Sequence, residues 1–276
     1  MGAVRTSVRS RSAGAASAQV SADVRPAAQI GVRAGICLSV CLGVIASGCS
    51  ADAGVMARGT ERGSAAAAER AAVRVIAEGC SARPTLGSGS FVRAGVVVTV
   101  AHVVAGARRI QVVSADGTTH EAAVSAIDRR TDLAVLAVPT AGIEPLPLGQ
   151  LDVGDTGTLV ATRRNVAVTE PFTVVRFVDL KANDIDGIDT SLRQAYQIEA
   201  DIEHGDSGAV LVVDGRATAV VWARSSITGN KAWATDIREA APLLALAADR
   251  TATEVTDVTE VTDVTDPIGG PCPGEQ

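Results

Sequence analysis

The sequence predicts an all-β fold, and two observations lead to that prediction. Aromatic residues make up 2% of the 276 residues, so the core must be built from Val, Ala, Leu and Ile. Short Val-rich runs recur along the middle of the chain and are separated by Gly, Asp and Asn, which favour turns. This spacing is typical of a β-sandwich or β-barrel rather than of alternating strands and helices.

The expected strands follow one another from residue 95 onward. They cover residues 95–100, 109–114, 120–127, 157–163, 172–178, 195–200 and 218–222. One helix is expected after them. Asp236 and Glu239 form a start that resembles a capping box, and an apolar stripe follows before Arg250, made of Ile237, Leu243, Leu244 and Leu246.

Three separated segments carry a serine nucleophile and the two side chains that it needs. His102 follows a Val-rich run, Asp132 precedes the alternating residues 133–138, and Ser207 lies in Gly-Asp-Ser-Gly at 205–208. A serine hydroxyl is a poor nucleophile at neutral pH, so a histidine must accept its proton and a carboxylate must orient that imidazole. The intervals leave room for about one small barrel of strands on each side of Asp132. The sequence therefore predicts a His-Asp-Ser triad.

Each of these residues also has an ordinary structural role as an alternative. Gly-Asp-Ser-Gly is a common turn sequence, and a histidine after an apolar run is more often a core residue. Asp128 competes with Asp132, which is favoured because a strand follows it directly. The order and spacing of the three segments together favour the triad.

These segments resemble the trypsin/chymotrypsin superfamily of serine proteases, most closely the short bacterial extracytoplasmic domains of the HtrA kind. The likeness runs from about Val73 to Leu246. It rests on Val-Val-Thr-Val-Ala-His-Val-Val at 97–104, Asp-Leu-Ala-Val-Leu at 132–136 and Gly-Ser-Gly-Ser-Phe-Val at 87–92. It implies two six-stranded antiparallel β-barrels, with a C-terminal α-helix on the second barrel.

The resemblance also implies a role for each residue of the site. Ser207 attacks a peptide carbonyl of a protein or peptide substrate, His102 acts as general base and then as general acid, and Asp132 orients His102. The N–H groups of Gly205 and Ser207 form the oxyanion hole. The expected enzyme is a serine-type endopeptidase that works through an acyl-enzyme.

Three further residues are implied on the substrate side. Trp222 and Ala223 lie on the strand that pairs with bound substrate. Asp201 occupies the place that trypsin-like enzymes use for the base of the specificity pocket, which implies a preference for a basic residue before the cleaved bond. Two departures from the family pattern stand beside these likenesses: Ala-Val replaces Gly-Pro after Gly208, and no activation cleavage motif supplies a new N-terminus to pair with Asp206.

Residues 1–48 are expected to be an export signal. A basic region precedes the uncharged residues 34–51, in which small residues lead to Cys49. This resembles a bacterial lipoprotein signal in which Cys49 becomes the lipidated residue, and it implies an extracytoplasmic location at the cell membrane. Cleavage without a lipid, which would give a secreted protein, and an uncleaved anchor are the alternatives.

The remaining segments follow from composition. Residues 49–72 are expected to be a flexible tether, residues 73–250 the protease domain, and residues 251–276 an acidic low-complexity tail. No PDZ-type module is expected after the domain, because few residues of the sequence follow it. In an oxidising compartment, Cys80 and Cys272 are expected to form a disulfide.

Several function classes are disfavoured by the sequence. No cofactor or metal is expected, because there are three histidines and neither a Cys-x-x-Cys nor a His-Glu-x-x-His motif. A net charge of −6 and the lack of a basic aromatic patch argue against a nucleic-acid partner. An esterase is disfavoured by the order of the triad. The alternative to the protease is an inactive, protease-fold protein that binds peptides or acts as a sensor.

Overall fold

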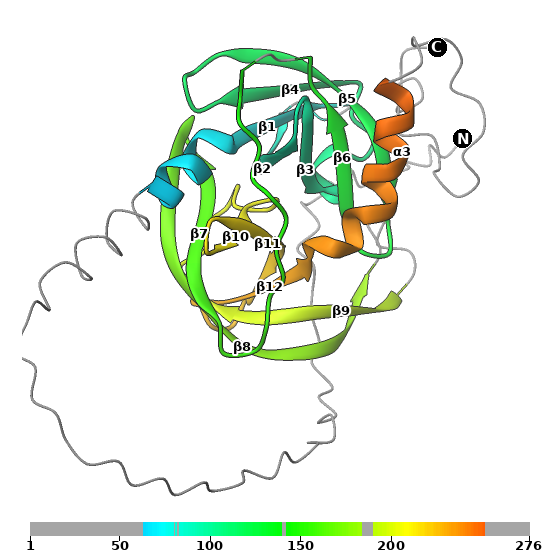
Figure 1. Ribbon diagram of the computed structural model, residues 1–276. Helices are drawn as coiled ribbons and strands as arrows, with labels where there is room; N and C mark the ends of the chain where they lie inside the picture. Colours follow the sequence, from blue (N-terminus) through cyan, green and yellow to red (C-terminus); the bar gives the residue numbers. More distant parts are fainter. Residues whose placement is uncertain (1–62, 80, 82, 140–141, 184–189, 252–276) are drawn as a thin grey trace, which may run out of the picture.

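Two closed six-stranded barrels make up the domain in the computed structural model, which describes residues 63–79, 81, 83–139, 142–183 and 190–251 (Figure 1). All the strand pairs within the barrels are antiparallel, in the orders β1-β2-β3-β6-β5-β4 and β10-β11-β12-β9-β8-β7. The all-β fold of two barrels that the sequence predicts is confirmed.

The first barrel is closed by pairing between β1 and β4. Its strands are β1 (Ala72–Glu78), β2 (Thr85–Arg93), β3 (Val96–Val100), β4 (Arg109–Ser114), β5 (Thr119–Asp128) and β6 (Leu133–Ala137). The one-turn helix α2 (Ala101–Val104) follows β3 without a break. The interior is filled by Val and Leu side chains with a single buried phenylalanine, Phe91, as the low aromatic content requires.

The second barrel is closed by pairing between β7 and β10. Its strands are β7 (Thr156–Arg163), β8 (Val166–Asn183), β9 (Thr190–Glu199), β10 (Val210–Val213), β11 (Arg216–Arg224) and β12 (Lys231–Asp236). Two of its hairpins use two-residue turns with both φ angles positive. These are Arg164-Asn165, at 51° and 66°, and Asp214-Gly215, at 49° and 74°. Such turns match the twist of the paired strands and fix their register.

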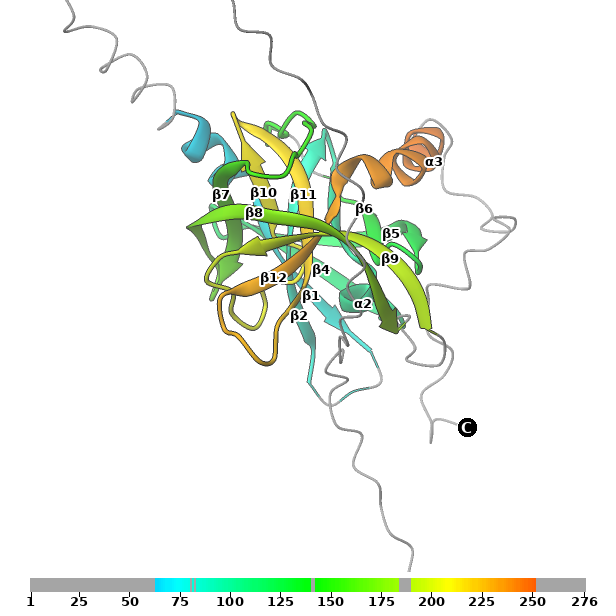
Figure 2. The ribbon, with the colours of Figure 1, turned by 90° about the horizontal axis from the view of Figure 1, so that it is seen from below.

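The chain ends its described part in a helical segment that begins as predicted. The Asp236 carboxylate accepts a hydrogen bond from the Arg238 N–H and starts a 3₁₀ turn, η1 (Ile237–Ala240), which continues as α3 (Ala241–Thr251). The expected position of this helix is wrong. It lies against β5 and β6 of the first barrel (Figures 1 and 2). The fully buried Ile237 and Leu244 join the hydrophobic cluster that fills the first barrel and extends into the second.

The expected tether is also shorter than the sequence suggested. Residues 63–71 are helical and lead directly into β1. Ala68 and Ala71 in this helix are fully buried, so it belongs to the domain. Cys49, Cys80 and Cys272 lie outside the described residues, as does the tail from residue 252. Over the residues that the structure describes, no helix has the length and apolar character needed to cross a membrane.

Candidate active site

His102 and Asp132 are brought together by the pairing of β3 with β6. Val100 at the end of β3 is opposite Leu133 at the start of β6, so the residues just outside this pair become neighbours. The His102 Nδ1 lies 2.8 Å from the Asp132 Oδ2. The His102 backbone N–H donates to the Asp132 Oδ1 at 2.9 Å. The two residues form the histidine–carboxylate pair that the sequence predicts.

Asp132 is held in place by its backbone as well as its side chain. Its φ angle is 61°, in the left-handed region that aspartate tolerates better than most residues. Its carbonyl accepts the N–H of Ala101 at 3.0 Å, and the residue is 3% exposed. The rival Asp128 instead caps its own turn, where it accepts the N–H groups of Arg130 and Thr131.

Ser207 lies in a tight loop between the two barrels. Gly205 and Gly208 on either side of it have φ angles of 100° and 91°. A Cβ atom at residue 208 would lie 1.9 Å from the carbonyl oxygen of Ser88, so only glycine fits there. The Gly208 N–H donates to the carbonyl of Val221 on β11, and this bond anchors the loop on the second barrel.

Ser88, on β2, ties this loop to the first barrel. Its N–H donates to the Ser207 carbonyl at 2.7 Å, and its hydroxyl donates to the Gly205 carbonyl at 3.0 Å. The same hydroxyl accepts the N–H of Thr162 on β7. Ser88 is fully buried, so these bonds join both barrels at the point where the Ser207 loop turns.

The structure also places Ser207 beside the helix that carries His102. A Cβ atom at Gly87 would lie 2.8 Å from the side chain of Val103, the residue after His102, and 2.9 Å from the Ser207 carbonyl. Among the hydrogen bonds of the described residues, none joins the Ser207 hydroxyl to His102. The three predicted residues therefore converge where the two barrels meet.

Asp206 has a buried partner that the sequence did not identify. The Arg163 Nη2 lies 2.7 Å from the Asp206 Oδ2 and its Nε lies 3.1 Å from Oδ1, which makes a two-pronged ion pair. Asp206 is fully buried. The hydrogen bond to Asp206 raises the pKa of Arg163, so the guanidinium stays charged. Arg163 is thus a cationic partner for Asp206 within the domain, whereas the sequence shows no activation cleavage motif that would supply a new N-terminus for this role.

A second arginine reaches the predicted triad. The Arg193 Nη1, from β9, lies 3.3 Å from the Asp132 Oδ2. The Arg193 guanidinium carbon lies 4.4 Å from the centre of the Trp222 ring, in cation–π contact. No local pattern points to either arginine, because Asp206 lies 43 residues from Arg163 and Asp132 lies 61 residues from Arg193.

Comparison with known proteins agrees with this arrangement. Residues 87–221 match the family model of the trypsin-like peptidase domain. The mitochondrial serine protease HTRA2 of Bos taurus is 38% identical over 140 residues, which are 49% of this chain and 30% of that protein. The serine endoprotease DegS of Escherichia coli (strain K12) is 33% identical over 134 residues, which are 46% of this chain and 36% of that protein.

The matched region, residues 87–221, is a trypsin-like peptidase domain, and it is similar to HtrA-type serine proteases. The Rv3671c protease from Mycobacterium tuberculosis, solved in its active form, superimposes with a TM-score of 0.60 at 26% identity, covering 75% of this chain and 93% of that one. The chain spans about a third of the length of the two curated relatives named above, 30% and 36%.

Two of the residues expected on the substrate side, Trp222 and Ala223, lie near the end of β11. Val221 is bonded on one side to the Gly208 and Ala209 backbone, while beyond it the strand continues in pairing with β12. Trp222 is buried, Ala223 is half-buried, and Asp201 is exposed. The Asp201 carbonyl accepts a hydrogen bond from Arg163 at 3.1 Å, so the backbone there is held by the same arginine that binds Asp206.

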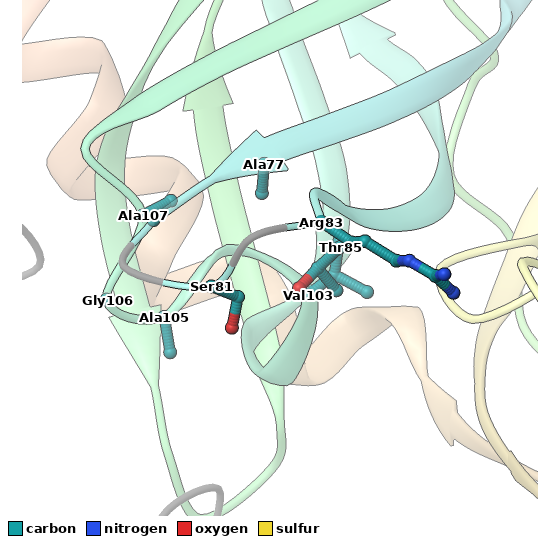
Figure 3. Close-up of a pocket in the computed structure, with 9 residues that line it drawn as sticks. Ala77, Ser81, Arg83, Thr85, Val103, Ala105, Gly106 and Ala107 are labelled. Atoms are coloured by element: carbon teal, nitrogen blue, oxygen red, sulfur yellow. The ribbon is translucent and has the colours of Figure 1, made fainter. Parts of the chain in front are cut away.

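A small pocket of about 100 Å³ adjoins the site on the first barrel (Figure 3). It lies between the segment that leads into β2 and the segment from α2 to β4. Thr85, Val103 and Gly106 are among its lining residues. Within the described ranges, no three His, Cys, Asp or Glu side chains are grouped so that they could hold a metal ion.

Proposed function

We propose that this chain is a serine endopeptidase that hydrolyses peptide bonds through a His102–Asp132–Ser207 triad. The observation that carries the proposal is the bond from the His102 Nδ1 to the buried Asp132 carboxylate at 2.8 Å. That contact holds the proton on Nδ1 and leaves Nε2 able to accept the proton of a serine hydroxyl. The family match and the Ser207 loop support the same reading.

The reaction divides into two acyl-transfer steps. Ser207 Oγ attacks the peptide carbonyl carbon while His102 takes the hydroxyl proton, and His102 then gives that proton to the leaving amine as the C–N bond breaks. Water attacks the resulting ester by the same route. Asp132 stabilises the imidazolium that forms in both steps.

The proposed oxyanion hole consists of the Gly205 and Ser207 N–H groups. Among the described residues, neither N–H donates a backbone hydrogen bond outside the strands and helices. The positive φ of Gly205 gives the loop its turn, and Ser88 binds the Gly205 and Ser207 carbonyls. Each such donor contributes about 10²–10³-fold to kcat in serine proteases.

Covalent labelling tests this proposal. A fluorophosphonate probe is expected to label the wild-type protein on Ser207, and Ser207→Ala is expected to abolish the labelling. Labelled casein gives the matching measurement of hydrolysis. An unlabelled and inactive wild-type protein would favour the peptide-binding alternative, and full hydrolysis by Ser207→Ala would refute the assignment.

We also propose that the protein is exported and tethered to a membrane through Cys49. The uncharged segment that ends at Gly48-Cys49 supports this location. The mature wild-type protein is then expected in the membrane fraction with a lipid mass on Cys49, and Cys49→Ser is expected to carry no lipid. A mature N-terminus far from residue 49, or a Cys49 without lipid, would favour plain secretion or an uncleaved anchor.

A further inference from the structure

Arg193 is a buried charge for which the three-residue mechanism has no use. Its side chain is 3% exposed, and it comes from β9, on the second barrel, to reach residues of the first. Its Nη1 contacts the Asp132 Oδ2 at 3.3 Å and its Nε donates to the Arg130 carbonyl at 2.9 Å. Its guanidinium also stacks on Trp222.

Burying a guanidinium is costly, so its contacts must be strong and specific to hold it there. Burial lowers the pKa of Arg193 from its ordinary value, and the carboxylates of Asp132 and Asp128 act in the opposite direction. The contacts with the Arg130 carbonyl and Trp222 fix the plane of the guanidinium. Its charge is thereby directed at one oxygen, the Asp132 Oδ2.

That oxygen is the one that also binds the His102 imidazole, at 2.8 Å. The Asp132 carboxylate therefore receives three donors: the His102 backbone N–H on Oδ1, and the His102 Nδ1–H and an Arg193 N–H on Oδ2. Since His102 and Arg193 share an oxygen, Arg193 restrains the carboxylate oxygen that orients the imidazole.

We infer that Arg193 is a positioning residue of the proposed triad, which fixes the Asp132 carboxylate against His102. This inference rests on the proposed function. A misplaced carboxylate would tilt the imidazole away from Ser207, and small misplacements of this kind cost up to about 10²-fold in rate.

The test follows the second-order rate of fluorophosphonate labelling between pH 5 and 9 in three variants. Arg193→Met removes the guanidinium and its contacts, and it is expected to lower the rate at pH 8 by about 10- to 10²-fold. Arg193→Lys keeps the charge without the planar guanidinium, so it is also expected to lower the rate. Arg176→Met removes an exposed arginine of β8 that contacts Gln197, and it is expected to match the wild type.

A folded Arg193→Met with the wild-type rate and profile would overturn the inference. If Arg193→Met does not fold, as judged by circular dichroism, Arg193→Lys decides: a reduced rate supports the inference and an unchanged rate overturns it. This test requires that the probe labels the wild-type protein. An unlabelled wild type counts against the proposed function, and the role of Arg193 is then judged from a measurement that does not depend on catalysis.

Proton NMR provides that separate measurement. The chain has three histidines, His102, His120 and His204, so the His102 ring signals can be assigned by substitution. In a Ser207→Ala background, adding Arg193→Met is expected to shift the signal of the His102 Nδ1–H that binds Asp132, because Arg193 no longer restrains the carboxylate. Adding Arg176→Met is expected to leave that signal unchanged. An unchanged Nδ1–H signal in Ser207→Ala/Arg193→Met would overturn the inference.

Discussion

Replacing Asp132 by asparagine is expected to lower kcat by about 10⁴-fold while the domain stays folded. Asparagine tolerates the φ of 61° that this position requires. It nearly matches aspartate in size, so the packing around the site is kept. The loss of activity then reports the chemistry of the carboxylate rather than the loss of the fold.

The size of this effect follows from the donors that surround Asp132. All three contacts to its side chain, two from His102 and one from Arg193, are donated to the carboxylate. An asparagine amide has one acceptor oxygen, and its NH₂ group must face at least one of these donors. With the oxygen on the His102 backbone N–H, the NH₂ group faces Nδ1, which must then be unprotonated. The proton moves to Nε2, and His102 can no longer accept the proton of Ser207.

Kinetics on a peptide substrate, together with circular dichroism and the melting temperature, check this prediction. Asp116→Asn is the matched control, because Asp116 is exposed and its carboxylate accepts the N–H of Thr118 in the turn between β4 and β5. It is expected to keep kcat within a few-fold of the wild type. A folded Asp132→Asn with near-normal kcat would remove Asp132 from the proposed triad.

Strands with a clear turn at each end could be predicted from the sequence. The expected strand at 109–114 coincides with β4, and the one at 157–163 differs from β7 by one residue. The strand at 172–178 was too short, since β8 continues from Val166 to Asn183 through a stretch that carries several charges. Period and turn signals locate a strand, whereas its length depends on how far its partner, here β9, continues beside it.

The strands without a visible signal were β1, β10 and β12. In β1, Val73, Val75 and Ala77 point inward, and this alternation follows directly on an alanine-rich helix. A run of small apolar residues suits a helix, a tether or a strand equally well, so pairing with β2 and β4 decides the outcome. β10 has four residues, too few for a periodic pattern.

The same limit applied to the candidate site. Glycines and short motifs identified His102, Asp132 and Ser207, because each lies in a short local motif whose residue types the catalytic chemistry or the backbone turn requires. Arg163 and Arg193 sit in ordinary strands, at positions where an arginine is most often solvated. Their importance arises from barrel closure, which brings residues of distant strands together, so only the three-dimensional structure could identify them.

Arg163→Met is expected to destabilise the domain by about 3–5 kcal/mol and to abolish activity. The substitution leaves the fully buried Asp206 carboxylate with one donor to its oxygens among the described residues, the N–H of Glu203 at 2.7 Å. An uncompensated buried charge accounts for a loss of that size. Because Asp206 precedes Ser207, the loop that presents the nucleophile loses one of its anchors at the same time.

Urea unfolding of a double-mutant cycle isolates the ion pair from other effects of the change. Asp206→Asn neutralises the buried carboxylate, so adding it to Arg163→Met is expected to recover most of the lost stability. Arg216→Met, which removes an exposed arginine of the same barrel bonded to the Leu148 carbonyl, is the control and should change stability by less than about 1 kcal/mol. If Arg163→Met were no more costly than this control, the Arg163–Asp206 pair would not be what holds the Ser207 loop. A large cost that Asp206→Asn relieves would instead show that the unpaired Asp206 charge is what destabilises Arg163→Met. Arg163 would then be the cation that neutralises Asp206, the role that a new N-terminus has in proteases activated by cleavage.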